Sequence, residues 1–92
     1  MKTFGIATLA VGIAIGLAPP AAASEDSYLA KVQDRLAYLS RDQLLTEAYK
    51  VCQVTLSGHA SPVAIPMVTE DLAITVPAAV EIITAAVTEF GC

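Results

Sequence analysis

The sequence predicts an all-α protein: a small four-helix domain with one disulfide, preceded by a cleavable signal peptide. Three observations predict this fold. Apolar residues after position 24 recur every three or four positions, the spacing of helices that bury one face. Capping and proline signals divide this part of the chain into four helical segments, with no strand pattern between them. Two cysteines stand in 92 residues, so a single intramolecular pair is possible.

Residues 1–23 have the features of a secretory signal peptide. Lys2 supplies the positive start, and an uncharged apolar run covers 4–18. Two prolines and three alanines follow, so we expect cleavage between Ala23 and Ser24. The alternative is an uncleaved membrane anchor, but a run of about 15 residues is shorter than the ~20 that span a bilayer.

The expected mature chain, residues 24–92, is acidic. Without Lys2 it carries four basic and nine acidic side chains, a net charge of −5. This balance argues against nucleic acid and anionic lipid as partners, because both need basic residues. No twin arginine precedes the apolar run. We therefore expect export by the general secretion route, to the cell envelope or the outside, without stable membrane insertion after cleavage.

Both cysteines, Cys52 and Cys92, belong to the expected mature chain. Two thiols in an oxidising compartment most simply form a disulfide. The alternatives are a pair of free thiols or a metal site. A zinc site takes four ligands, and the chain offers two Cys and one His. We predict a Cys52–Cys92 disulfide, with no metal and no cofactor.

The first two helices are predicted over 27–39 and 41–57. The first is marked by apolar residues at helical spacing: Leu29, Val32, Leu36 and Leu39. The second begins with a capping-box signature, Ser40 and Gln43, and ends at Gly58. Its apolar face is expected to centre on Cys52, with Leu45, Ala48 and Leu56 close by. Its polar face is expected to hold Gln43, Thr46, Glu47, Lys50 and Gln53.

The other two helices are predicted within 62–73 and over 76–90. Ser61 looks like an N-cap followed by a first-turn proline, and Pro66 either kinks the third helix or begins it. The fourth helix has Thr75 as its N-cap and Pro77 in its first turn. Its polar stripe is narrow: Glu81, Thr84 and Thr88. A helix that is apolar on most sides is surrounded by others, so we expect it to be central.

Few side chains suggest chemistry. His59 is the single histidine, and a metal or haem ligand would need partners that the spacing does not supply, so we expect a solvated turn residue. The neighbouring acids Glu25-Asp26 and Glu70-Asp71 are expected to be solvated helix ends. Nucleophile, phosphate-loop and calcium-loop motifs are absent from the sequence. We therefore do not expect an enzyme.

The tyrosines suggest contacts instead of chemistry. Tyr28 and Tyr49 flank apolar faces and are expected in the core. Tyr38 falls on the polar side of the first helix. Because tyrosine is enriched at protein interfaces, Tyr38 is the better candidate for a contact, and His59 is a second possible contact.

A set of spaced residues carries a family resemblance. Tyr28-Leu29 opens the first helix, Asp42-Gln43-Leu44-Leu45 precedes Val51-Cys52, and Leu56-x-Gly58 and the final Cys92 follow. This pattern resembles the small exported mycobacterial proteins called domain of unknown function 732, over most of 26–92. The resemblance implies an all-α fold, export and the Cys52–Cys92 bond, and it implies no catalytic residues. The family's Gly-Ile step after the first helix and its proline after the last cysteine are missing.

Two function classes remain open. The first is a non-enzymatic protein-interaction module of the cell envelope or extracellular space, with an unknown protein partner. The second is a carrier of a small apolar ligand such as haem or lipid. A filled core favours the first class, and an internal apolar cavity of several hundred Å³ favours the second.

Overall fold

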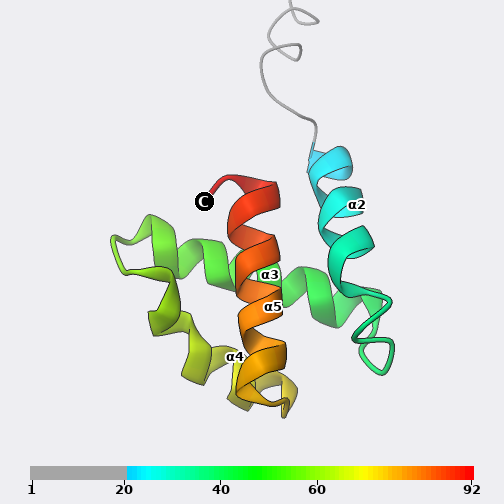
Figure 1. Cartoon of the computed structure of the whole chain (residues 1–92). Coiled ribbons are helices and arrows are strands. Elements are labelled where there is room, and N and C mark those ends of the chain that lie inside the picture. Colours follow the sequence, from blue (N-terminus) through cyan, green and yellow to red (C-terminus); the bar gives the residue numbers. More distant parts are fainter. Residues whose placement is uncertain (1–20) are drawn as a thin grey trace, which may run out of the picture.

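The computed structural model describes residues 21–92. Four α-helices and one short 3-10 helix follow one another in this range, with no strand (Figure 1). The signal peptide predicted for 1–23 lies almost wholly outside the described residues. The elements are α2 (Ala21–Val32), α3 (Arg41–Leu56), η2 (Ser61–Ala64), α4 (Ile65–Leu72) and α5 (Val76–Phe90). The all-α, four-helix prediction is confirmed for this part of the chain.

Helix α5 is the centre of the domain, as its narrow polar stripe predicted. Figure 1 shows α3 crossing behind α5, with α2 on one side and α4 on the other. α2 and α5 run antiparallel, since Tyr28 packs against Phe90 and Arg35, just after α2, pairs with Glu81. The buried face of α5 combines three alanines with two isoleucines, and the small residues let neighbouring helices approach closely. The residues of this face are Ala79, Ile82, Ile83, Ala85 and Ala86.

The first helix differs from its predicted bounds of 27–39. α2 begins earlier and ends at Val32, and turns cover 33–38. Leu36 and Leu39 are buried nevertheless. The apolar spacing therefore predicted burial correctly, but not the helix end. The turns change the direction of the chain between the end of α2 and Ser40, the N-cap of α3.

The predicted helix starts at Ser40 and Thr75 are confirmed. The Ser40 hydroxyl accepts from the Gln43 N–H and the Gln43 side chain accepts from the Ser40 N–H, which completes the capping box. The Thr75 side chain accepts from the Ala78 N–H at the start of α5. Gly58 ends the second helix with a φ of 96°.

The third segment is a 3-10 helix that continues into α4. Ser61 is not an N-cap: Ala60 occupies that position, and no side chain caps the 3-10 helix. Pro66 lies in the first turn of α4, where its missing N–H costs no helical hydrogen bond. The proline therefore lies at the start of α4, which begins at Ile65, and does not interrupt it.

The buried face of α3 is rotated from the predicted one. Leu44, Ala48 and Val51 are fully buried, so the face centres on them and not on Cys52. Leu56, predicted on the apolar face, is 75% exposed at the end of the helix. Glu47, predicted on the polar face, is buried. Both corrections follow from the same rotation.

Every basic side chain of residues 21–92 forms an ion pair with another element. Lys31 pairs with Glu89 and Arg35 with Glu81, which joins the end of α2 and its following turn to α5. Arg41 of α3 reaches Glu25 of α2 at 4.0 Å. Lys50 of α3 pairs with Asp71 of α4. The acids without such a pair in this range are Asp26, Asp34, Asp42, Glu47 and Glu70.

Candidate functional site

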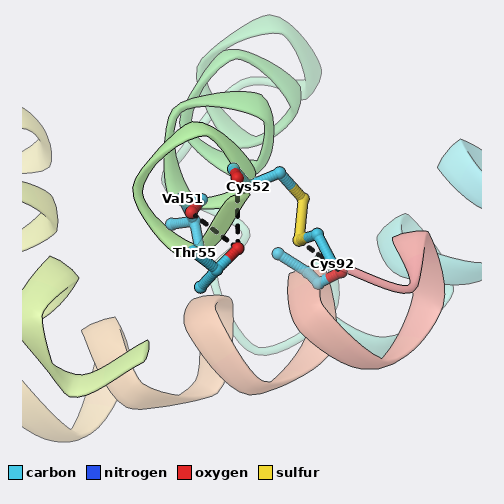
Figure 2. The surroundings of a disulfide bond; sticks show 5 residues. Val51, Cys52, Thr55 and Cys92 are labelled. Carbon is cyan, nitrogen blue, oxygen red and sulfur yellow. Dashed lines mark hydrogen bonds between the residues drawn. A yellow bond between two sulfur atoms is a disulfide. The ribbon is translucent and has the colours of Figure 1, made fainter. Parts of the chain in front are cut away.

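The predicted cysteine pair is brought together. The sulfurs of Cys52 and Cys92 lie 2.09 Å apart, at disulfide distance, and their Cα atoms are 5.3 Å apart. Figure 2 shows the bond joining α3 to the short tail that follows α5. The pair leaves no free thiol among the described residues, so the alternatives of free thiols or a cysteine metal site fall away there. Its role is structural.

An aromatic cluster fixes the same end of α5. Phe90 packs between two tyrosines, with ring centroids 5.6 Å from Tyr28 and 5.1 Å from Tyr49. The Tyr28 hydroxyl is buried and donates to the Leu44 carbonyl at 2.7 Å. Burial, followed by the nearby Glu47, raises the pKa of Tyr28 well above its ordinary value.

Tyr49 is less buried than predicted. The residue is 42% exposed, although its ring packs against Phe90. The hydroxyl donates to Glu25 at 2.6 Å. Glu25 is therefore not a freely solvated helix end: it accepts from Tyr49 and faces Arg41. Its neighbour Asp26 is exposed, as predicted, but both acids lie within α2 and not at a helix end, because the helix begins at Ala21.

The two predicted contact residues are exposed but lie outside the hollows described below. Tyr38 is 67% exposed in the turns after α2. His59 is exposed just after Gly58. Neither lines any of the three hollows. The expected cleavage position, Ala23–Ser24, lies in the first turn of α2, and its cleavage stays a prediction.

A groove of about 390 Å³ runs between α2 and α5. Its floor is apolar, and the two ion pairs that join α2 and its following turn to α5 lie along it. We call this the α2–α5 groove; it is lined by Lys31, Val32, Arg35, Val80, Glu81, Thr84, Ala85 and Thr88. It is open to solvent and is not an internal cavity.

A smaller hollow of about 150 Å³ lies between η2 and α5. Val80 and Thr84 line both this hollow and the α2–α5 groove. Val80 is 41% exposed, and Val76, one turn earlier on the same face, is 54% exposed. Valines at i and i+4 thus give α5 an uncovered apolar stripe with a depression on each side. The sequence placed α5 at the centre but did not show which of its sides stays uncovered.

The third hollow, about 410 Å³, is polar and lies between α3 and α4. We call it the α3–α4 groove; it is lined by Asp42, Gln43, Thr46, Glu47, Lys50, Asp71 and Leu72. Glu47 is only 2% exposed, and its Oε2 has no hydrogen-bond partner among the described residues. Burial first, then a side-chain hydrogen bond with Asp71, raises the pKa of Glu47 to about 7.

Asp71 has the opposite shift, because hydrogen bonds from Lys50 and Glu47 lower its pKa. Glu70 and Asp71 are exposed in the last turn of α4, as predicted, but the prediction missed the pairing of Asp71 with Lys50. Sequence reasoning also missed Glu47. The signal was available: Glu47 is three residues after Leu44 and four before Val51, both fully buried, so all three share a side of the helix.

Neither a metal site nor a simple membrane span emerges from residues 21–92. This range has no group of three or more metal-ligating side chains placed to hold an ion. No single helix in it is long and apolar enough to cross a membrane. Ser61–Leu72 and Val76–Phe90 reach that length and hydropathy together, but are bent by 118° at the break between them.

No family model, curated protein or solved structure matches the chain. Its function must therefore be argued from its own residues.

Proposed function

We propose that the domain is an exported, non-enzymatic protein-interaction module of the cell envelope or extracellular space. The observation that carries the proposal is the α2–α5 groove, which is an open surface feature with an apolar floor. A carrier would enclose most of its ligand's surface in a cavity. A protein partner, by contrast, needs an accessible apolar patch into which it can insert a side chain.

The charges define the chemistry of the partner. The cations along the α2–α5 groove, Lys31 and Arg35, are already paired with acids of α5. Asp34, which precedes the groove residue Arg35 in the chain, has no ion pair among the described residues. The domain therefore suits a partner that places an apolar side chain on Val80 and basic side chains around it.

Export and family remain parts of this proposal. The signal-peptide pattern of 1–23 supports export, and a Cys52–Cys92 disulfide fits an oxidising compartment. The resemblance to domain of unknown function 732 agrees with an exported, disulfide-closed helical protein. A non-enzymatic role is supported by the position of His59, the single histidine, which lies outside all three hollows.

The test is a pair of matched apolar-to-charged variants. Val80→Lys places a cation between the α2–α5 groove and the neighbouring hollow, whereas Leu56→Lys makes the same change at an exposed site that lines no hollow. Complexes of the secreted protein are measured by native mass spectrometry. We expect Val80→Lys to weaken a defined protein complex at least about tenfold. Leu56→Lys should leave that complex intact.

Two outcomes contradict the proposal. If both variants retain the complex equally, the α2–α5 groove is not the interaction surface. If the native protein instead carries a small apolar molecule such as haem or a lipid, with no protein partner, the carrier function is correct. The intact mass also reports the cleavage position and the two-hydrogen loss of a disulfide.

A further inference from the structure

The α3–α4 groove contains a buried carboxyl group, that of Glu47, which has no ion pair among the described residues. Glu47 is 2% exposed, and its Oε2 is enclosed with no hydrogen-bond partner in residues 21–92. Burying an ionised carboxylate costs far more free energy than burying the neutral acid. The packing around Glu47 therefore favours its protonated form.

The groups that face Glu47 come from three helices. Asp71 of α4 lines the α3–α4 groove together with Glu47 and raises the pKa of Glu47. Lys50, one turn on along α3, is the nearest cation, but it is bound to Asp71. From α2, Tyr28 faces Glu47 but donates its hydroxyl hydrogen to Leu44. The acids of α5, Glu81 and Glu89, pair with Arg35 and Lys31 beside α2.

This arrangement makes the contact between α3 and α4 depend on one proton. When Glu47 is protonated, its hydroxyl can donate to the Asp71 carboxylate, which Lys50 keeps ionised. When Glu47 loses that proton, two carboxylates face each other across the helix contact and one of them is buried. α4 has eight residues, and its single fully buried side chain is Val68. Ile65, Met67 and Leu72 are only partly buried against the core, so the charge state of the α3–α4 contact weighs on how firmly the helix is held.

We propose that Glu47 and Asp71 form a proton-dependent latch, which holds α4 against α3 at mildly acid pH and loosens as Glu47 ionises. Loosening uncovers Val68 and the apolar side chains beneath it. α4 also packs against α5, but α5 is held to α3 by the Cys52–Cys92 bond and packs against α2, so it keeps these other contacts when α4 loosens.

The direction of the pH dependence follows from linkage. The pKa of Glu47 is raised from 4.5 to about 7 in the folded protein, so the closed form binds the proton more tightly than the open form. Below pH 4.5 Glu47 is protonated in both the closed and the open form, so its full contribution to closing the latch is present there. Opening of α4 then becomes up to about tenfold more frequent per pH unit as pH rises to 7, and levels off above it.

Amide hydrogen exchange of the oxidised protein tests the latch. Protection factors of residues 65–72, corrected for the intrinsic pH dependence of exchange, are compared with those of α5 from pH 5 to 8. We expect protection in α4 to fall with pH up to about 7, while α5 changes much less. Equal pH dependence in both helices, or none in α4, would overturn the proposal.

Two variants sharpen the test. Glu47→Gln keeps a hydrogen-bond donor toward Asp71 but cannot ionise, so α4 should stay protected at every pH. Glu70→Gln removes the same charge from the residue next to Asp71, outside the groove lining, and should keep the wild-type pH dependence. A Glu47→Gln protein with the wild-type slope refutes the latch.

A direct titration covers the case in which Glu47→Gln does not fold. Carbon-13 shifts of the wild-type glutamate carboxyls give the midpoint of Glu47. A midpoint near 7 supports the latch, and one near 4.5 overturns it.

Discussion

The ring of Tyr28 packs against Phe90 while its hydroxyl donates to the Leu44 carbonyl, so one residue of α2 contacts both α3 and α5. The side chain is fully buried. Its hydrogen bond therefore forms where no water competes for either partner. Tyr49 contacts the other side of Phe90, but its hydroxyl bonds to Glu25 at the surface.

This contrast predicts different costs for two identical substitutions. Tyr28→Phe keeps the ring but removes the buried donor, and we expect it to lower the free energy of unfolding by about 1–2 kcal/mol. Tyr49→Phe removes an exposed hydrogen bond and should cost less than about 1 kcal/mol. Urea unfolding followed by circular dichroism measures both values. Equal costs would show that burial adds nothing to the strength of the Tyr28 hydrogen bond.

At this scale the sequence predicted apolar burial better than polar burial. The spacing of Leu29, Val32, Leu36 and Leu39 identified four buried residues, because apolar side chains follow one face. Glu47 was placed on the wrong side, because a charged residue was expected to be exposed. Its spacing from the buried Leu44 and Val51 was the local signal for its burial, whereas its neighbour Asp71 is 24 positions away in the chain and no local pattern links the two.

The joint between α4 and α5 is the most strained part of the described backbone. Ala73 ends α4 in the left-handed conformation, with φ 54° and ψ 50°. Among the non-glycine residues of 21–92, only Ala73 has positive φ. A β-carbon makes this conformation unfavourable, which is why glycine usually occupies the position after a helix.

We predict that Ala73→Gly stabilises the protein. Removing the β-carbon relieves the left-handed strain and outweighs the added freedom of glycine in the unfolded chain, for a net gain of about 0.5–1 kcal/mol. Ala60→Gly is the matched control. Ala60 has a φ of −68°, so glycine there relieves no strain and should be neutral or destabilising. Thermal unfolding of the two variants checks the opposite signs, and a loss of stability in Ala73→Gly would contradict the argument.

Helix boundaries were predictable where a side chain caps the helix. Ser40 and Thr75 supply the hydrogen bonds that satisfy the first N–H groups, so both starts were correct. The end of α2 has no such signal, since the turns over 33–38 continue the apolar spacing. The helix ends at Val32 because the chain must turn there toward the start of α3. This requirement comes from the tertiary fold, and a local sequence pattern does not show it.

At the scale of the whole described domain, residues 21–92, packing around α5 and one disulfide hold the helices together. α5 forms the centre, and its last residue is held by two tyrosines. The tail after it is bonded to α3 through Cys92. The sequence identified the cysteine pair, because only one intramolecular pairing exists. The grooves were not predicted, because they depend on how far neighbouring helices extend over one another.

The Cys52–Cys92 bond is expected to supply a large share of the total stability. It closes a loop with a sequence separation of 40, for which the chain-entropy estimate is about 4 kcal/mol. A core in a domain below ~70–80 residues rarely supplies more than about 3–5 kcal/mol, so losing the bond should sharply lower the melting temperature. Thermal unfolding with and without reductant measures this loss.

The variant pair Cys52→Ser and Cys52→Ser/Cys92→Ser separates loss of the cross-link from the effect of a leftover thiol. Both should melt at similar, lower temperatures, because either removes the same constraint from the unfolded chain. Urea titration should then show a lower midpoint in both. If full reduction leaves the melting curve unchanged, the packing of Phe90 between its tyrosines holds the C-terminal end alone, and the disulfide is dispensable for the fold.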